Sequence, residues 1–248
     1  MKRELEDGTF FESRLRINLA DKKKCQEKLS FCKQLGIKNV IIEPRFHNQL
    51  INANQKTALQ DRHDLNIFFR INLKLDDVKA FKKQVQKFNG FPHIISVESR
   101  NKDVHIHAAR DSRVDIVSFS HPKVLPSLTS GVISLVKQNG SFIEFSLGPI
   151  MGMNKRDQSR NFRNLYKSLK RARKHKVNFI VSGNFKKKFD MRHPRALISI
   201  INTLLDVMIQ EAKNVCKIHP RKLISRATNR SNGDVMEPGV KLITEEGK

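Results

Sequence analysis

Basic side chains crowd one segment of the chain, residues 155–188. This segment contains 13 Lys and Arg residues and a single acid, Asp157. A solvated helix face usually mixes charges so that i,i+4 ion pairs form, and this segment offers almost no such pairs. Repulsion among these cations is relieved when phosphate groups lie against them, so the pattern favours contact with the backbone of RNA or DNA. An ordinary solvated helix face is the alternative.

The histidines and carboxylates are the other candidates for chemistry. His105 and His107 form an HxH pair, which in metal-dependent phosphoesterase barrels stands at the end of a strand. Here the pair falls in a segment with helical character, where side chains at i and i+2 do not face one another. Packed or RNA-facing histidines are therefore favoured over a metal site, and we expect no metal ligands in this chain.

Glu98 and Glu144 fall in strand-like runs and are candidates for an acid/base pair. A buried ion pair with a neighbouring arginine, such as Arg70, Arg100 or Arg113, is the favoured interpretation in so basic a protein. No nucleophile elbow, P-loop or dinucleotide-binding fingerprint is present. The sequence thus predicts no catalytic residue.

The composition of the whole chain agrees with a polyanionic partner. Its 248 residues carry 48 Lys and Arg against 24 Asp and Glu, a formal net charge of +24. No run approaches the roughly 18 apolar residues of a membrane span, and the first residues lack the apolar region of a secretory signal. The three cysteines (Cys25, Cys32 and Cys216) form no CxxC motif, so we expect buried thiols and a reducing compartment.

Seven short strand-like runs alternate with helical segments along about 200 residues. Several runs are almost continuously apolar, which is typical of parallel strands covered on both faces. The pattern predicts either a doubly wound sheet or a (β/α)8-like barrel. The runs are Leu15–Leu19, Asn39–Glu43, Asn66–Leu73, His93–Glu98, Val114–Phe119, Ser141–Leu147 and Val177–Ser182.

The helical segments include one with strong amphipathic spacing after the third strand and a long basic one over Asp157–Lys176. After about residue 213 the periodicity weakens. We therefore predict one α/β domain over residues 1–213, and a C-terminal appendage of short helices with a mobile tail over residues 214–248.

Cationic and polar side chains stand at the predicted strand ends, where a barrel carries its functional face. Arg110 and Arg113 bracket a tight connection in which Asp111 is expected to accept hydrogen bonds from nearby backbone N–H groups or from Arg113.

One segment, ISVESRNKDVHIHAARDSRVDIVSF (Ile95–Phe119), resembles the central signature of the archaeal and eukaryotic ribonuclease P protein component 3 family, the p30 subunit. FIEFSLGPI (Phe142–Ile150), NFIVSGN (Asn178–Asn184) and MRHPRALISIINTLLDV (Met191–Val207) agree with it in order and spacing. The C-terminal sequence DVMEPGVKLITEEGK is also similar to archaeal members. The resemblance covers roughly Phe10 to Arg226.

The resemblance implies an irregular TIM-type (β/α) barrel of about seven parallel strands, related to metal-dependent phosphoesterase barrels but without their metal site. It implies a subunit of the ribonucleoprotein endonuclease that removes 5′ leaders from precursor tRNA. In that enzyme the ribonuclease P RNA carries the active site and its Mg²⁺, so we expect a chain that needs no cofactor and is not catalytic alone.

The resemblance also implies partners: the ribonuclease P RNA, precursor tRNA as substrate of the holoenzyme, and a small α/β RNA-binding subunit with which the chain forms a heterotetramer. We expect a cytoplasmic location, or a nuclear one in a eukaryote. Matching positions suggest RNA contacts by Arg70, Arg100, Lys102, Arg110, Arg113 and Asn184. Charge alone adds Arg171, Arg173, Lys174, Lys186, Lys187 and Lys188.

Two alternatives stay open from the residues themselves. One is a metal-dependent phosphoesterase or nuclease that acts alone, which stoichiometric metal in the purified chain would favour. The other is a general RNA-binding or ribosome-associated protein, which only the charge supports.

Overall fold

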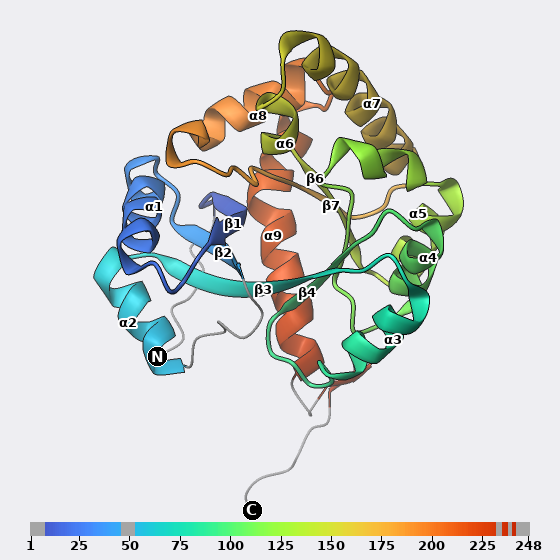
Figure 1. The fold of residues 1–248 in the computed structure, drawn as a ribbon, viewed down its shortest axis with the longest axis horizontal. Coiled ribbons are helices and arrows are strands. Elements are labelled where there is room, and N and C mark those ends of the chain that lie inside the picture. Colours follow the sequence, from blue (N-terminus) through green and yellow to red (C-terminus); the bar gives the residue numbers. More distant parts are fainter. Residues whose placement is uncertain (1–7, 46–52, 232–234, 238–239, 242–248) are drawn as a thin grey trace, which may run out of the picture.

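The computed structural model describes residues 8–45, 53–231, 235–237 and 240–241. Seven parallel strands form one sheet in the order β1 to β7, and each strand pairs with the next in sequence. Figure 1 shows that the sheet curves into a nearly closed barrel with helices around it. The strands are β1 (Phe11–Ile17), β2 (Asn39–Pro44), β3 (Asn66–Lys74), β4 (Ile94–Glu98), β5 (Ile116–Ser118), β6 (Phe142–Ser146) and β7 (Phe179–Ser182).

This strand order decides between the two predicted architectures. A doubly wound sheet reverses its strand order at a switch point, whereas here the order never reverses and β1 lies against β7. The prediction of an irregular TIM-type barrel with seven parallel strands is confirmed.

Most connections between the strands are helical, and several helices begin at a side chain that caps them. Asp21, Asp77, Asn101, Thr129 and Asn154 each accept a hydrogen bond from a backbone N–H of the first turn. None of the described helices is both long and apolar enough to cross a membrane. The helices are α1 (Lys22–Gln34), α2 (Ala53–His63), α3 (Val78–Gln86), α4 (Lys102–Arg110), η2 (Pro122–Ser127), α5 (Ser130–Gln138), α6 (Gly148–Met151), α7 (Lys155–Lys174), η3 (Lys188–Asp190), α8 (Pro194–Thr203) and α9 (Ile209–Ser231).

The amino-terminal end of the barrel is filled by an apolar layer. Each strand contributes one residue to it from among its first three, and α9 adds three more. α9 therefore covers and closes this end of the barrel, and Figure 1 shows it running behind the strands. The layer consists of Phe11, Ile41, Phe68, Ile94, Ile116, Phe142 and Ile180 from the strands and Leu223, Ile224 and Ala227 from α9.

The region after residue 213 differs from the prediction of short helices in an appendage. A single helix, α9, starts at Ile209 and crosses the expected domain boundary, and it packs on β1, β4 and β7. Asp115, which is fully buried, holds the helix through ion pairs with Arg226 (3.4 Å) and Arg230 (2.5 Å). The weak apolar periodicity of α9 has a physical reason: Arg226 and Arg230, which bind backbone carbonyl groups, stand among its buried apolar residues.

Beyond α9, β8 (Val235–Glu237) and β9 (Val240–Lys241) pair antiparallel. The rest of the predicted mobile tail, residues 232–234, 238–239 and 242–248, lies outside the described residues.

The first strand also begins earlier than expected, at Phe11 rather than Leu15. The polar residues Glu12, Ser13 and Arg14 belong to the strand, and all three are buried. A strand that carries charges into the interior of the barrel lacks the apolar pattern by which buried strands are usually identified.

The role of α9 in closing the amino-terminal end of the barrel can be tested at Leu223, whose side chain is fully buried. Leu223→Ala should lower the free energy of unfolding by about 2–5 kcal/mol, because it leaves a cavity at the centre of the apolar layer. Urea unfolding measures the change, and the exposed neighbour Lys222 provides the control. Equal stabilities for Leu223→Ala and Lys222→Ala would show that α9 is an appendage after all.

Candidate nucleic-acid interface

Above the apolar layer, the interior of the barrel is charged. The side chains of Arg14 and Arg70 are fully buried there. Arg70 binds Glu144 with two parallel hydrogen bonds of 2.8 Å, one to each carboxylate oxygen. Arg14 reaches Glu43 (2.6 Å), Glu98 (3.1 Å) and Glu144 (3.2 Å). Two guanidinium groups thus compensate the carboxylates that point into the barrel, a pattern in which each charge depends on its partners.

Serine hydroxyls complete this network. Ser118 donates to Glu144 (2.7 Å), and Arg14 donates to both Ser118 and Ser120. Burial alone would raise the pKa of Glu144, but the nearby guanidinium groups of Arg70 and Arg14 outweigh it and hold that pKa at about 2. The carboxylate is therefore charged at neutral pH and is occupied as an acceptor from several sides.

The predicted ion pair of Glu144 with Arg70 is confirmed. Glu98 pairs with Arg14 rather than with Arg100 or Arg113. The expectation that Arg70 contacts RNA needs correction, because its guanidinium group has no exposure and is bound inside the barrel.

Glu12 bridges the seam between the first and last strands. Its carboxylate accepts hydrogen bonds from the backbone N–H groups of Arg14 (3.0 Å) and Gly183 (3.2 Å). Burial raises the pKa of Glu12 to about 7, against the opposing effect of these N–H donors. At Gly183 a Cβ atom would collide with the Glu12 carboxylate, so this close approach requires glycine.

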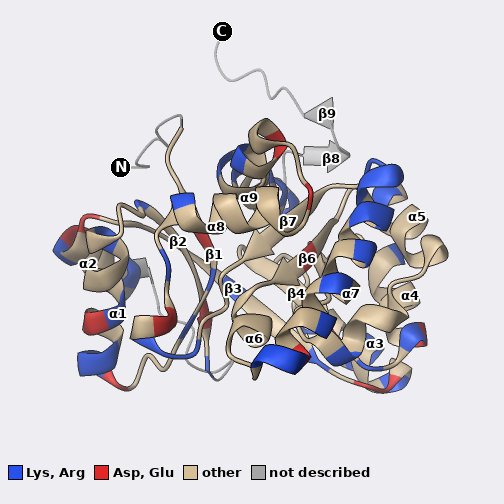
Figure 2. Ribbon diagram, turned by 90° about the horizontal axis from the view of Figure 1, so that it is seen from above, with Lys and Arg blue, Asp and Glu red and all other residues tan. Residues whose placement is uncertain are grey.

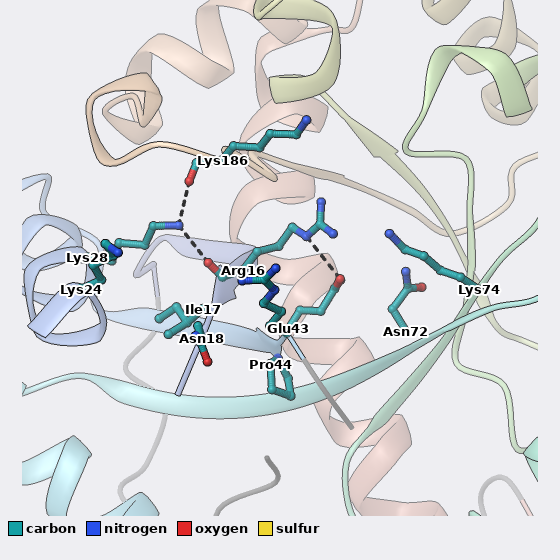
Figure 3. Close-up of a pocket in the computed structure, with 11 residues that line it drawn as sticks. Arg16, Ile17, Asn18, Lys24, Lys28, Glu43, Pro44, Asn72, Lys74 and Lys186 are labelled. Carbon is teal, nitrogen blue, oxygen red and sulfur yellow. Dashed lines mark hydrogen bonds and ion pairs between the residues drawn. The ribbon is translucent and has the colours of Figure 1, made fainter. Parts of the chain in front are cut away.

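A cavity of about 710 Å³ opens at the carboxyl ends of β1, β2 and β3. Figure 3 shows Lys28 on one side of this mouth pocket and Asn72 and Lys74 on the other, with Arg16 and Glu43 between them. In barrels of this type the carboxyl ends of the strands carry the functional face. The lining residues are Arg16, Ile17, Asn18, Lys24, Lys28, Glu43, Pro44, Arg45, Asn72, Lys74 and Lys186.

Charge is the main property of the mouth pocket. Glu43 is the one acid among these lining residues, and it is already paired with Arg14 and Arg16. Lys28 donates to the carbonyl oxygens of Arg16 (2.8 Å) and Lys186 (3.0 Å), which fixes its ammonium group at the wall. Burial lowers the pKa of Lys28, and it also lowers that of Lys74. An anion in the pocket would offset the energetic cost of burying both ammonium groups, because an opposite charge nearby favours their charged form.

The long basic helix α7 presents a second cationic surface. Figure 2 shows Lys and Arg along most of its length. Its apolar side is buried through Leu165, Leu169 and Ala172, so the exposed cations project away from the barrel. The exposed residues of this surface are Lys155, Arg156, Arg160, Arg163, Lys167, Lys170, Arg171 and Lys174.

Two of the predicted RNA-binding residues of α7 have structural partners. Arg173 forms an ion pair with Glu211 (2.7 Å) and donates to the carbonyl of Asp206, so it fastens α7 to α9. Arg171 donates to the carbonyl of Leu128 (2.7 Å) while part of it stays exposed. Lys174 is exposed on the same turn.

The remaining predicted residues are spread over the carboxyl end of β4, both ends of α4 and the segment after β7. Arg100, Lys102 and Arg110 are exposed. The guanidinium group of Arg113 donates two hydrogen bonds to the Asp111 carboxylate (2.8 and 2.7 Å). The same carboxylate also accepts from the backbone N–H of Arg113. The predicted role of Asp111 in the turn is therefore confirmed.

The segment after β7 contains four of the predicted residues. Asn184 is buried with φ of +49° and donates to Ser146, so it belongs to the interior. Lys186 lines the mouth pocket and Lys187 is exposed. Lys188 approaches Glu27 of α1 at 3.8 Å.

The HxH pair lies on α4, as the helical character predicted. His105 is fully buried, with Nε2 accepting from the backbone N–H of Ser99 and Nδ1 bonded to Ser127. Burial lowers its pKa to about 4, so the ring is neutral at pH 7. Among the described residues, no group of three or more His, Cys, Asp and Glu side chains is arranged to hold a metal ion. The three cysteines are free and buried, as expected.

Several residues of this region were missed by the sequence interpretation, namely Glu12, Arg14, Arg16, Lys28 and Lys74. A signal for four of them exists: Glu12, Arg14 and Arg16 on β1 follow the period of two that places side chains on one face of a strand, as does Lys74 two positions after Asn72 on β3. No such signal marks Lys28, which reaches the pocket from α1.

The model of the RNase P subunit p30 family matches residues 11–232. Ribonuclease P protein component 3 of Methanocaldococcus jannaschii is 23% identical over 195 residues, which cover 76% of this chain and 81% of that protein. The protein of the same name from Haloarcula marismortui is 22% identical over 189 residues, covering 75% and 77%.

Solved structures share the fold. A chain in the cryo-EM structure of archaeal ribonuclease P with mature tRNA superposes with a TM-score of 0.73 at 20% identity, over 90% of this chain and 96% of that one. Ochratoxinase of A. niger gives a TM-score of 0.55 at 11% identity, over 83% and 66% of the two chains. A prolidase complexed with N-methylphosphonate-L-proline gives 0.56 at 9% identity, over 94% and 77%.

The seam at Glu12 predicts a pH dependence of stability. Because its pKa is raised from 4.5 to about 7 in the folded state, its contribution is complete below pH 4.5 and is lost as the pH rises through 7. Glu12→Gln keeps an acceptor oxygen and removes the titration. The wild type loses this contribution as the pH rises and the variant does not. The unfolding free energy of the variant minus that of the wild type should therefore rise by up to about 3 kcal/mol between pH 4.5 and 8.

Urea unfolding of both proteins across this pH range measures the difference. The comparison cancels the opposite trend expected from His93 and His105, whose pKa values are both lowered to about 4. A constant difference between the two curves would show that Glu12 does not titrate in this range.

Proposed function

The chain belongs to the RNase P subunit p30 family and is a protein subunit of ribonuclease P; we propose that in this enzyme it binds and stabilises the RNA that removes 5′ leaders from precursor tRNA. The observation that carries the proposal is the chemistry of the barrel. Its interior carboxylates are bound by Arg14 and Arg70, while its mouth and α7 present cations. Such a barrel is suited to holding phosphate groups.

The proposal assigns the chemical step to the RNA subunit with its Mg²⁺ and requires no cofactor in this chain. It also includes a complex with RNA and tRNA, by analogy with the matched chain, which lies in an archaeal ribonuclease P bound to mature tRNA. A small α/β RNA-binding protein is proposed as the protein partner, in a heterotetramer, and the cytoplasm as the location.

Within this function, α7 contacts the RNA backbone. Its exposed cations lie along one side with few acids to neutralise them: Asp157 pairs with Arg160 at the start of the helix, and Glu211 pairs with Arg173 near its end. RNA phosphates would replace the missing counter-charges. Arg100, Lys102 and Arg110 extend the proposed contacts to α4, while Lys186 and Lys187 extend them to the segment after β7.

The division of labour between chain and RNA is testable by reconstitution. We expect the purified chain to leave the 5′ leader of precursor tRNA intact, with or without Mg²⁺, because the interior carboxylates are held by arginines. Gel analysis should show leader removal only after the ribonuclease P RNA is added. Cleavage by the RNA-free chain that is lost in His105 or His107 variants would instead establish an enzyme that acts alone.

The α7 surface predicts a salt effect. Replacing the exposed Arg163, Lys167 and Lys174 with Ala should reduce the slope of log affinity against log salt by about 0.7–0.9 for each phosphate that the variant no longer neutralises. The melting temperature should be unchanged, because these side chains project away from the core.

Arg173→Ala is the matched control on the same helix. It should lower stability by about 1 kcal/mol by releasing Glu211 and the carbonyl of Asp206, while the salt slope stays close to wild type. A triple variant with an unchanged salt slope would identify α7 as a solvated surface.

A further inference from the structure

We infer that the mouth pocket and the exposed ring of Phe189 form one binding site for an unpaired RNA segment, with phosphates in the pocket and a base stacked on the ring. This inference deepens the proposed function and rests on it, since it names the kind of RNA that one part of the barrel takes.

Phe189 is unusual among the phenylalanines of this protein. It is 77% exposed, whereas the rings of the core are buried. Its ring makes an edge contact with Phe31, with ring centroids 6.5 Å apart at 69°. The ammonium group of Lys188 lies 5.0 Å from its centroid. The cation lies over one face of the ring, and an exposed ring with a nearby cation is an arrangement on which single-stranded nucleic acids stack their bases.

Contacts with α1 hold the segment that carries Phe189 beside the pocket. Lys28 on α1 binds the carbonyl of Lys186, Glu27 on α1 pairs with Lys188, and Phe31 on α1 contacts Phe189. Positions 24, 28 and 31 lie on one side of the helix, where residues three and four apart are neighbours. The pocket wall at Lys24 and Lys28 therefore continues directly to the aromatic pair.

Phosphate is the group that the pocket would take. The ammonium groups of Lys74 and Lys186 have no hydrogen-bond or ion-pair partner within the described part of the chain, although both residues line the cavity. Figure 3 shows Lys74 across the pocket from the fixed Lys28, and the side chain of Lys186 extending away from the carbonyl that Lys28 binds. An RNA strand with its phosphates between Lys74 and Lys186 would supply negative charge to both ammonium groups. Glu43 does not supply it, because its carboxylate is already paired with Arg14 and Arg16.

The shape of the site favours an unpaired segment over a duplex. A cavity of about 710 Å³ has the size of a small-molecule pocket and admits a nucleotide, while paired RNA presents a wide, shallow surface. In a duplex the faces of the bases are also covered by their neighbours, so none is available to Phe189. A single strand can insert its backbone and turn out a base at once.

Phe189→Trp provides a direct reporter, because the chain contains no other tryptophan. Titration of the full chain with a short RNA of only adenosine and cytidine, which cannot pair with itself, should quench the tryptophan fluorescence. A perfectly paired RNA duplex at the same nucleotide concentration should leave it almost unchanged. Ile218→Trp, at a site 44% exposed on α9 at the opposite end of the barrel from the mouth pocket, is the matched control and should respond to neither RNA.

Affinity measurements complete the test. Phe189→Ala should weaken binding of the unpaired RNA about 5- to 150-fold, the range for loss of one base–aromatic stack, with duplex binding and melting temperature unchanged. Ile218→Ala should alter neither affinity. Combining Lys74→Ala with Lys186→Ala should reduce the salt slope for the unpaired RNA by about 1.4, since each phosphate contact on a single strand contributes about 0.7.

The outcomes separate the inference from the proposed function. Unpaired RNA that binds Phe189→Ala as tightly as wild type, or that leaves Phe189→Trp unquenched, overturns the inference while RNA binding by α7 stands. A chain that binds neither RNA refutes both. If the Phe189 variants keep full RNA affinity but fail to assemble with the protein subunits of the reconstituted holoenzyme, the ring belongs to a protein interface and the inference is wrong.

Discussion

The bidentate pair between Arg70 and Glu144, shared with Arg14, is the interaction on which the rest of this structure depends. All three side chains are fully buried at the centre of the barrel, where an uncompensated charge is very unfavourable. Removing one of the three would leave the buried charges of the other two incompletely compensated. The strands that carry these residues, β1, β3 and β6, must therefore keep their register for the barrel to form.

The same network determines the character of the functional face. Glu43 and Glu98 point from the interior toward the mouth, but Arg14 binds both of them. Arg14 therefore compensates the negative charge of both carboxylates inside the barrel, so that little of it remains to neutralise the cations at the rim. Barrels of this type carry their functional face at the carboxyl ends of the strands. In this chain the residues that line that region include several cations and one acid, Glu43, which is already paired.

The large positive charge is divided between two tasks. Arg226 and Arg230 hold α9 under the barrel by binding Asp115 and carbonyl groups at the amino ends of strands. Arg173 holds α7 against α9 in a similar way. The cations left exposed on α7 and those that line the mouth form two separate surfaces.

Much of the fold was determined locally and could be predicted from the sequence. Apolar runs such as Asn39–Glu43 mark buried parallel strands, and capping residues such as Asp77 and Asn101 mark where helices begin. The alternation of these elements, together with the resemblance of Ile95–Phe119 to a known family, indicated the barrel. The basic surface of α7 was also evident, because its charge and its apolar stripe lie in one continuous segment.

Only the tertiary structure decided what each charged residue does. Arg70 and Arg100 look equivalent as residues near strand ends, yet one is buried against Glu144 and the other is exposed. The difference depends on which face of a strand turns into the barrel and on partners more than 70 positions away in the sequence. The mouth pocket likewise combines α1, three strand ends and Lys186, so its charge exists only once the barrel has closed.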